Sequence, residues 1–123
     1  MQVYGIGTDI IEIDRFNQSD GRFEEKFMLR CFTEQEREHL SKRRLESVAG
    51  YFAAKEAVAK ALGTGFAGFM PASIEIRCNP EGKPEVFLHN EAAKIAKRAG
   101  ITKIDISISH CETLAVAMAV AQI

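Results

Sequence analysis

The sequence predicts an α+β domain in which a small antiparallel sheet packs against one long buried helix. Residues 48–62 are small or apolar at nearly every position, which is typical of a helix buried on all sides. Residues 104–109 and 114–121 instead alternate with the two-residue period of β-strands. At 123 residues the chain has the size of one domain, so we expect a single domain over residues 1–123.

The N-terminal part is predicted to form a strand followed by helices. Residues 3–9 are β-prone, and the apolar spacing of residues 10–16 suits a helical turn, so Asp9 is expected at the carboxyl end of a strand. A helix is predicted over residues 21–30. Residues 33–36 form a capping box that opens another short helix.

The long helix is expected to start at Ser47 and to stop at the Gly63-Thr64-Gly65 sequence, since glycine commonly terminates helices. A Gly-containing loop then runs to Pro71. The remaining predicted elements are a strand at 73–78, a turn at 80–82, a strand at 83–88 and a helix at 90–99 closed by Gly100.

The last two strands are expected to form a hairpin. If the isoleucines at 104, 106 and 108 share a face with the large side chains at 114, 116, 118 and 120, even positions pair with even ones. That register requires an odd-length loop such as residues 111–113. The alanine face of the second strand then also needs a cover, which favours a symmetric oligomer.

Charge and cysteine content argue against several classes of protein. The 16 Lys and Arg residues balance 17 Asp and Glu residues, so no global charge marks a nucleic-acid or membrane-surface binder. No two of the cysteines 31, 78 and 111 have the spacing of a metal-binding or redox motif, so we expect each thiol to be buried or without a chemical role.

The N-terminus lacks the pattern of a signal peptide, and no apolar run is long enough to cross a membrane. We therefore expect a cytoplasmic protein.

Three charges on the buried helix require either a structural or a functional explanation. Lys55, Glu56 and Lys60 would each cost several kcal/mol if buried without a partner. A Glu56 to Lys60 pair is the structural alternative, but such a pair contributes only about 0.3 to 0.5 kcal/mol on an exposed helix and leaves Lys55 unexplained.

Asp9 is a candidate partner for Glu56 in a metal site. Magnesium usually takes one or two protein carboxylates and completes its shell with water and substrate phosphate oxygens. The structural alternative for Asp9 is a helix N-cap.

Two sequence motifs resemble the holo-[acyl-carrier-protein] synthases, which are bacterial 4′-phosphopantetheinyl transferases. They are GIGTDIIEIDR at residues 5–15 and FAAKEAVAKALGTG at residues 52–65. The resemblance continues through FTEQE at 32–36, GKP at 82–84 and SISH at 107–110, so it covers essentially the whole chain. It implies the 4′-phosphopantetheinyl transferase fold.

The resemblance also implies a reaction. Coenzyme A would donate its phosphopantetheine arm to a serine of apo-acyl carrier protein, in fatty acid biosynthesis, with release of adenosine 3′,5′-bisphosphate. Asp9 and Glu56 would hold Mg²⁺ on the diphosphate, and Lys60 would add a fixed positive charge. The base that takes the serine proton is open between Glu56, a metal-bound water and His110.

Contacts to coenzyme A are implied for Lys60 and for two further regions of the chain. These residues are Gly63, Gly82, Lys83, Pro84, Ser109 and His110. For His110, the resemblance favours ligand contact over catalysis, and a surface or hydrogen-bonding role at the strand end is the structural alternative.

The acidic carrier protein would need a basic docking face. Arg22, Lys26 and Arg30 recur every four residues, which places them on one helical face, and Arg15 precedes them. A solvated helix face is the alternative. The preceding polar stretch 17–21 is shorter and less basic than in relatives.

The resemblance implies a homotrimer with active sites between subunits. A non-catalytic oligomer that holds coenzyme A or a carrier protein is the alternative function, and the presence of Asp9, Glu56 and Lys60 favours the enzyme.

Overall fold

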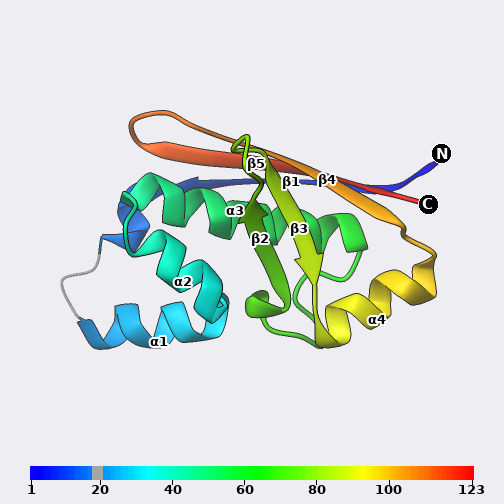
Figure 1. Cartoon of the computed structure of the whole chain (residues 1–123), viewed down its shortest axis with the longest axis horizontal. Helices are drawn as coiled ribbons and strands as arrows, with labels where there is room; N and C mark the ends of the chain where they lie inside the picture. The colour runs from blue at the N-terminus through cyan, green and yellow to red at the C-terminus, as the bar shows by residue number, and fades with distance from the viewer. Residues whose placement is uncertain (18–20) are drawn as a thin grey trace.

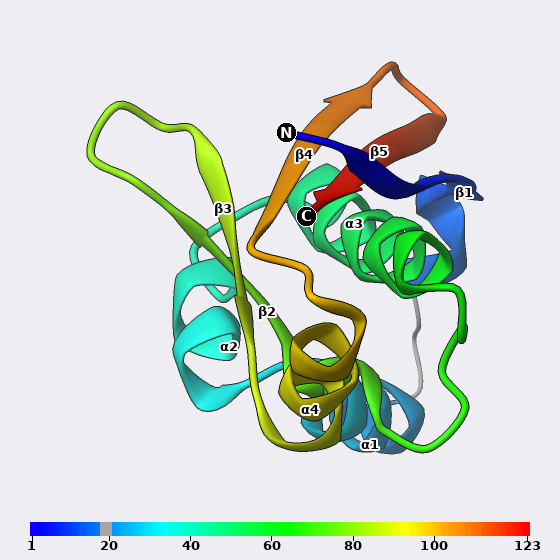
Figure 2. The same ribbon diagram turned by 90° about the vertical axis from the view of Figure 1, so that its right-hand side faces the viewer.

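The structure is a computed structural model that describes residues 1–17 and 21–123, with no side-chain description for residues 21–24. Its elements in chain order are β1 (Val3–Glu12), the 3₁₀ helix η1 (Ile13–Phe16), α1 (Gly21–Cys31), α2 (Glu34–Leu40), α3 (Leu45–Leu62), the 3₁₀ helix η2 (Pro71–Ser73), β2 (Ile74–Cys78), β3 (Pro84–Leu88), α4 (Asn90–Ala99), β4 (Lys103–His110) and β5 (Leu114–Gln122). Figure 1 shows the three-stranded sheet stretched along one side of α3. Helices α1, α2 and α4 lie away from this sheet, and the β2–β3 hairpin lies beside its edge strand β4 (Figure 2).

Helix α3 is the centre of the molecule. Thirteen of its 18 residues are buried, and seven of these are alanine or glycine, so the backbone of neighbouring elements can approach closely. The helix begins at Leu45, two residues before the predicted start. It ends as predicted, because Gly63 adopts the left-handed conformation with φ of 86° that favours glycine.

The larger sheet is antiparallel, with strand order β1-β5-β4. Where β1 and β5 rest on α3, the inner face carries glycine at positions 5 and 7 and alanine at alternate positions of β5. Gly5 and Gly7 of β1 lie so close to α3 that an added Cβ would sit 2.3 Å from the Ala61 carbonyl oxygen and 1.9 Å from that of Ala57. The sheet and the helix therefore fit together only because these positions lack side chains.

The predicted register of the β4–β5 hairpin is wrong. Three residues separate the strands, but Cys111 still donates a backbone hydrogen bond to Leu114, and Ile106 pairs with Ala119 rather than with an even position. The isoleucines of β4 thus face the same side as the alanines of β5. In β5, the middle strand, the fully buried positions on that side are alanines, because this strand packs closely on α3 and its larger side chains point outward.

The prediction that the alanine face of β5 needs a cover from another subunit is wrong as well. Helix α3 covers the alanine face, while the large residues point outward. Ile6 and Ile10 of β1 are 63% and 64% exposed, beside Val116 and Met118 of β5. Among the described elements, none covers this outer face (Figure 1). We call these four residues the outer apolar stripe.

Asp9 does not end its strand. Strand β1 continues for three residues beyond it to Glu12, and only residues 13–16 form the helical turn predicted for 10–16. The strand is longer because β5 provides pairing partners as far as Leu114, opposite Glu12. Regular strand residues therefore both precede and follow Asp9 in β1.

The smaller elements agree with the prediction within one residue. Strands β2 and β3 form an antiparallel hairpin, and α4 spans Asn90–Ala99 with Gly100 as its C-cap. The capping box at α2 is present, with the Thr33 hydroxyl accepting from the Glu36 amide and the Glu36 carboxylate accepting from the Thr33 amide.

The close contact between β1 and α3 generates a prediction about two glycines. Gly7→Ala should lower the free energy of unfolding by about 1–3 kcal/mol, because the new methyl group meets a backbone oxygen that cannot move alone. Gly50→Ala is the matched control: its methyl group would meet only the movable Ile108 side chain, and alanine favours the helix by about 1 kcal/mol. Urea unfolding measures both. Equal stability of the two variants would contradict the account.

Candidate active site

Lys60 connects helix α3 to strand β1 at Asp9. Its ammonium donates to the Thr8 carbonyl oxygen at 2.9 Å and lies 3.4 Å from Asp9 Oδ1. Asp9 follows Gly7 by two residues on the same inner face of the strand, so the contact between Gly7 and α3 brings its carboxylate to the helix. Lys60 is half exposed and Asp9 mostly covered, which leaves the pair accessible from solvent.

Glu56 lies one helical turn before Lys60 and faces the same region. Partial burial raises the pKa of its carboxyl group, and the negative charge of Asp9 raises that pKa further. The charges of Lys60 and Arg15 act in the opposite direction. The two carboxylates and the Lys60 ammonium thus form one electrostatically connected group.

The structural alternatives for these residues do not hold. The N-cap of η1 is Glu12, without a side-chain hydrogen bond, so Asp9 caps no helix there. Lys60 forms its ion pair with Asp9 rather than with Glu56. Within residues 1–17 and 21–123, no hydrogen bond or ion pair engages the Glu56 carboxylate, which therefore faces the site as an acceptor.

The donor set fits a magnesium ion bound together with a phosphate-bearing substrate. Asp9 and Glu56 repel one another, and a shared cation would relieve that repulsion. In the described part of the chain, no group of three or more His, Cys, Asp and Glu side chains could hold a metal. Two carboxylates suit magnesium, which keeps several positions for water and phosphate oxygens.

An apolar pocket of about 510 Å³ lies beside Glu56. Its aromatic walls come from α1, α3 and the loop after α3, and consist of Phe27, Phe52, Phe66 and Phe69. Met70, Pro71 and Cys31 complete the apolar lining, and the exposed cations Lys26 and Arg30 of α1 also border it. We call this cavity the Glu56 pocket.

The loop residues of the Glu56 pocket were missed by the sequence analysis. Phe66, Phe69 and Met70 follow the helix stop at Gly63, where a solvent-exposed loop is normally polar. Several large apolar residues within one short loop were the available signal, because such side chains need a surface to pack against.

Residues predicted to contact coenzyme A do not all gather around Asp9 within one chain. Gly63 caps α3, one turn beyond Lys60, and so lies near the site. Gly82, Lys83 and Pro84 lie at the turn of the β2–β3 hairpin, which extends away from β1 and α3 (Figure 2). Ser109 and His110 end β4, two strands away from β1.

The predicted docking cations lie on η1 and α1. Lys26 and Arg30 are exposed, and the side chain of Arg22 lies outside the described residues. The guanidinium of Arg15 stacks 5.6 Å from the centre of the Phe52 ring.

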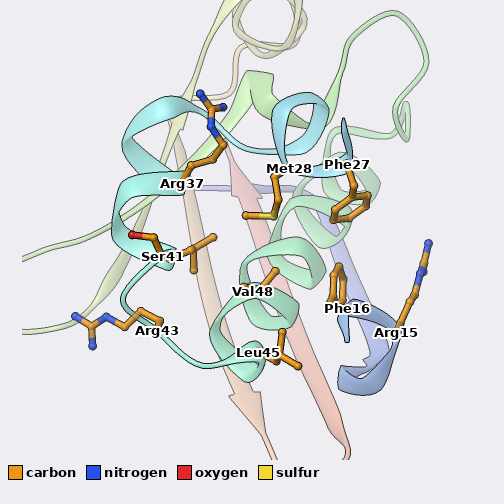
Figure 3. A pocket seen from close by; sticks show the side chains of 10 residues that line it. Arg15, Phe16, Phe27, Met28, Arg37, Ser41, Arg43, Leu45 and Val48 are labelled. Carbon is orange, nitrogen blue, oxygen red and sulfur yellow. The ribbon is translucent and has the colours of Figure 1, made fainter. Parts of the chain in front are cut away.

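A second pocket, of about 450 Å³, lies next to these cations between η1, α1, α2 and α3. Figure 3 shows Phe16, Phe27 and Met28 directed toward it, with Arg37 and Arg43 on its α2 side. Phe27 lines both this pocket and the Glu56 pocket, so one aromatic side chain of α1 separates them.

No helix in the part of the chain that the structure describes has the length and apolar content to span a membrane.

Comparison with known proteins identifies the family. A profile of the 4′-phosphopantetheinyl transferase superfamily matches residues 5–119. The holo-[acyl-carrier-protein] synthase of Caldicellulosiruptor bescii is 46% identical over 122 residues, which cover 98% of each chain. The crystal structure of the Neisseria meningitidis holo-[acyl-carrier-protein] synthase has a TM-score of 0.89 and 35% identity, covering 98% of this chain and 99% of that one.

A further solved relative contains coenzyme A. The holo-[acyl-carrier-protein] synthase of Helicobacter pylori in complex with coenzyme A has a TM-score of 0.84 and 31% identity, and covers 95% of this chain and 99% of its own. Both the sequence and the fold agree over nearly the whole length, and the chain belongs to the holo-[acyl-carrier-protein] synthases of the 4′-phosphopantetheinyl transferase superfamily.

Proposed function

We propose that the protein transfers the 4′-phosphopantetheine group of coenzyme A to a serine of apo-acyl carrier protein, in the cytoplasm and in fatty acid biosynthesis. The observation that carries the proposal is the group formed by Asp9, Glu56 and Lys60 at the contact of β1 with α3. It combines two acceptor carboxylates and a cation, which suits the binding of a metal-bridged diphosphate.

The reaction exchanges one phosphorus–oxygen bond for another. The serine oxygen bonds to the phosphorus next to the pantetheine, and the bond from that phosphorus to the leaving adenosine 3′,5′-bisphosphate breaks. Asp9 and Glu56 would hold a magnesium ion, which would supply Lewis-acid stabilisation of the charge that develops on the phosphate oxygens. Lys60 places a positive charge beside the diphosphate oxygens. The hydrogen bond from its ammonium to the Thr8 carbonyl holds that charge in position.

Glu56 is also the best-placed base of this chain for the serine proton. It lies near Asp9 of the same chain, whereas His110 ends β4, two strands from β1, and could reach the site only from a neighbouring subunit.

Transfer activity can be measured directly by mass spectrometry of the carrier. We expect the purified protein with coenzyme A and Mg²⁺ to add the phosphopantetheine mass to apo-acyl carrier protein. Glu56→Gln should reduce the rate by about 10²-fold or more, because it weakens both metal binding and proton transfer. The matched control Glu46→Gln, in the first turn of the same helix, should react normally.

The alternative function is that of an oligomer which binds coenzyme A or a carrier protein without turnover. Normal binding of coenzyme A without a mass change in any of several carriers, by folded wild-type protein, would favour that alternative over the enzyme.

We propose a homotrimer whose active sites lie between subunits. The outer apolar stripe of Ile6, Ile10, Val116 and Met118 supports an interface there, since exposed apolar residues on a continuous sheet face mark interaction sites. Ser109 shares this outer face, and the turn 82–84 is distant from Asp9 in one chain, so a neighbouring subunit is needed to bring both sets together.

The oligomer proposal is tested by a charge in the stripe. Met118→Glu should convert the trimer to monomer, because the buried carboxylate would lack a partner. Leu29→Glu, at an exposed apolar position of α1 outside the sheet, is the control and should remain trimeric. Light scattering after size-exclusion chromatography gives the mass. A monomeric wild-type protein would exclude the trimer.

We propose that the acidic carrier docks on Arg15, Arg22, Lys26 and Arg30. Lys26 and Arg30 are exposed and border the Glu56 pocket, so a carrier bound to them would lie next to the site of transfer.

Charge reversal tests this docking face. Lys26→Glu with Arg30→Glu should raise the KM for the carrier by about tenfold or more at low salt, and the difference should shrink as salt screens the charges. Lys94→Glu with Lys97→Glu on α4 changes the net charge equally and should have little effect. An equal rise in KM for both pairs would show a general charge effect and contradict the assigned face.

A further inference from the structure

We infer that Lys55 is a positioning residue for the transfer reaction: its buried ammonium anchors the backbone that follows the loop of residues 64–70 and so holds the aromatic wall of the Glu56 pocket. The inference rests on the proposed function. It assigns a role to Lys55, the buried charge of α3, which neither metal binding nor the phosphate contacts employ.

Lys55 is fully buried and faces away from the site. Successive residues of an α-helix point about 100° apart, so Lys55 enters the core while its neighbour Glu56 faces the pocket. Its ammonium donates to Glu36 Oε1 at 2.8 Å, to the Pro71 carbonyl oxygen at 3.3 Å and to the Ile74 carbonyl oxygen. All three donors are therefore used.

The two carbonyl contacts connect Lys55 to the pocket. Pro71 lines the Glu56 pocket itself and directly follows the loop that carries Phe66, Phe69 and Met70. One wall of the pocket thus comes from α3, through Phe52 and Glu56, and another is attached to α3 by the preceding residue, Lys55. The same helical turn fixes both walls relative to each other.

A role in stability alone is the competing explanation. The Glu36 carboxylate also accepts from the Thr33 and Ile76 amides, so the pair certainly joins α2 and β2 to α3. A buried ion pair is weak evidence for stability, however, because well-packed apolar residues often serve as well. What an apolar pair cannot replace is the attachment of the Pro71 and Ile74 carbonyls.

Two variants separate the roles. Lys55→Met removes both the ion pair and the carbonyl anchor. Lys55→Met with Glu36→Gln also removes the unpaired carboxylate that the single change leaves buried, so the double variant should be more stable than the single one. It still lacks the anchor. Ile106→Val, in the core on β4, is the control for a loss of stability away from the pocket.

Steady-state kinetics on folded protein should separate the two substrates. For both Lys55 variants we expect kcat/KM for the carrier to fall by about tenfold or more, because a displaced pocket wall misaligns the acceptor serine. The KM for coenzyme A should stay within about threefold, since Asp9, Glu56 and Lys60 are intact. Ile106→Val should leave both parameters unchanged.

The Cys31 thiol gives a second measurement that needs no activity. Cys31 is buried and lines the Glu56 pocket, whereas Cys78 and Cys111 are exposed. Because burial raises the pKa of the Cys31 thiol and the charge of Lys55 lowers it, the rates are compared as rate constants for the thiolate, obtained from the pH dependence of labelling. In a Cys78→Ser, Cys111→Ser background, this rate constant for a disulfide reagent should be about tenfold or more higher in the double Lys55 variant, well below its unfolding temperature, and unchanged in Ile106→Val.

The inference is overturned if the double variant keeps wild-type kcat/KM for the carrier, or if Ile106→Val loses as much. Unchanged Cys31 labelling in the double variant would overturn it too. If the wild-type protein transfers nothing, the proposed function fails while the labelling experiment still tests the anchor.

Discussion

The close contact of the β1–β5–β4 sheet with helix α3 is the constraint on which the site depends. Glycine in β1 and alanine in β5 and α3 let the backbones approach to distances that no larger side chain permits. This approach lets Lys60 reach the Thr8 carbonyl and brings Asp9 toward Glu56. The inner surface thus brings Asp9, Glu56 and Lys60 together, and the large residues of β5 are consequently directed outward.

The charged side chains Lys55, Glu56 and Lys60 of α3 are close in sequence but differ in burial. Lys55 lies in the core, where Glu36 and two carbonyls satisfy it, while Glu56 and Lys60 lie at the surface that faces β1. The side chains of α3 are small and apolar on most of its surface. The helix can therefore place Glu56 and Lys60 on one polar side while its buried charge, Lys55, keeps its partners. Lys55 and Glu56 are therefore neighbours in sequence with different roles: Lys55 is a cation of the core, and Glu56 is the proposed metal-binding carboxylate.

The elements of the fold could be predicted wherever local patterns determine them. Helix α4 was predicted with its observed bounds because its polarity is periodic and Gly100 ends it. The β4–β5 register could not be derived, since alternation shows two faces but not which one meets α3. The partner of Lys55 is Glu36, 19 residues away, and no spacing rule relates them. The grouping of Asp9 with Lys60 came from the family resemblance, because 51 residues separate them.

The central claim is that Asp9 and Glu56 together bind magnesium on the diphosphate of coenzyme A. Isothermal titration of coenzyme A into the protein, with and without Mg²⁺, tests it most directly. The account predicts that Mg²⁺ tightens binding to the wild-type protein by about tenfold or more, and that Asp9→Asn abolishes this gain while the protein stays folded. Binding of coenzyme A that is equally tight with and without Mg²⁺ in the wild-type protein would contradict it.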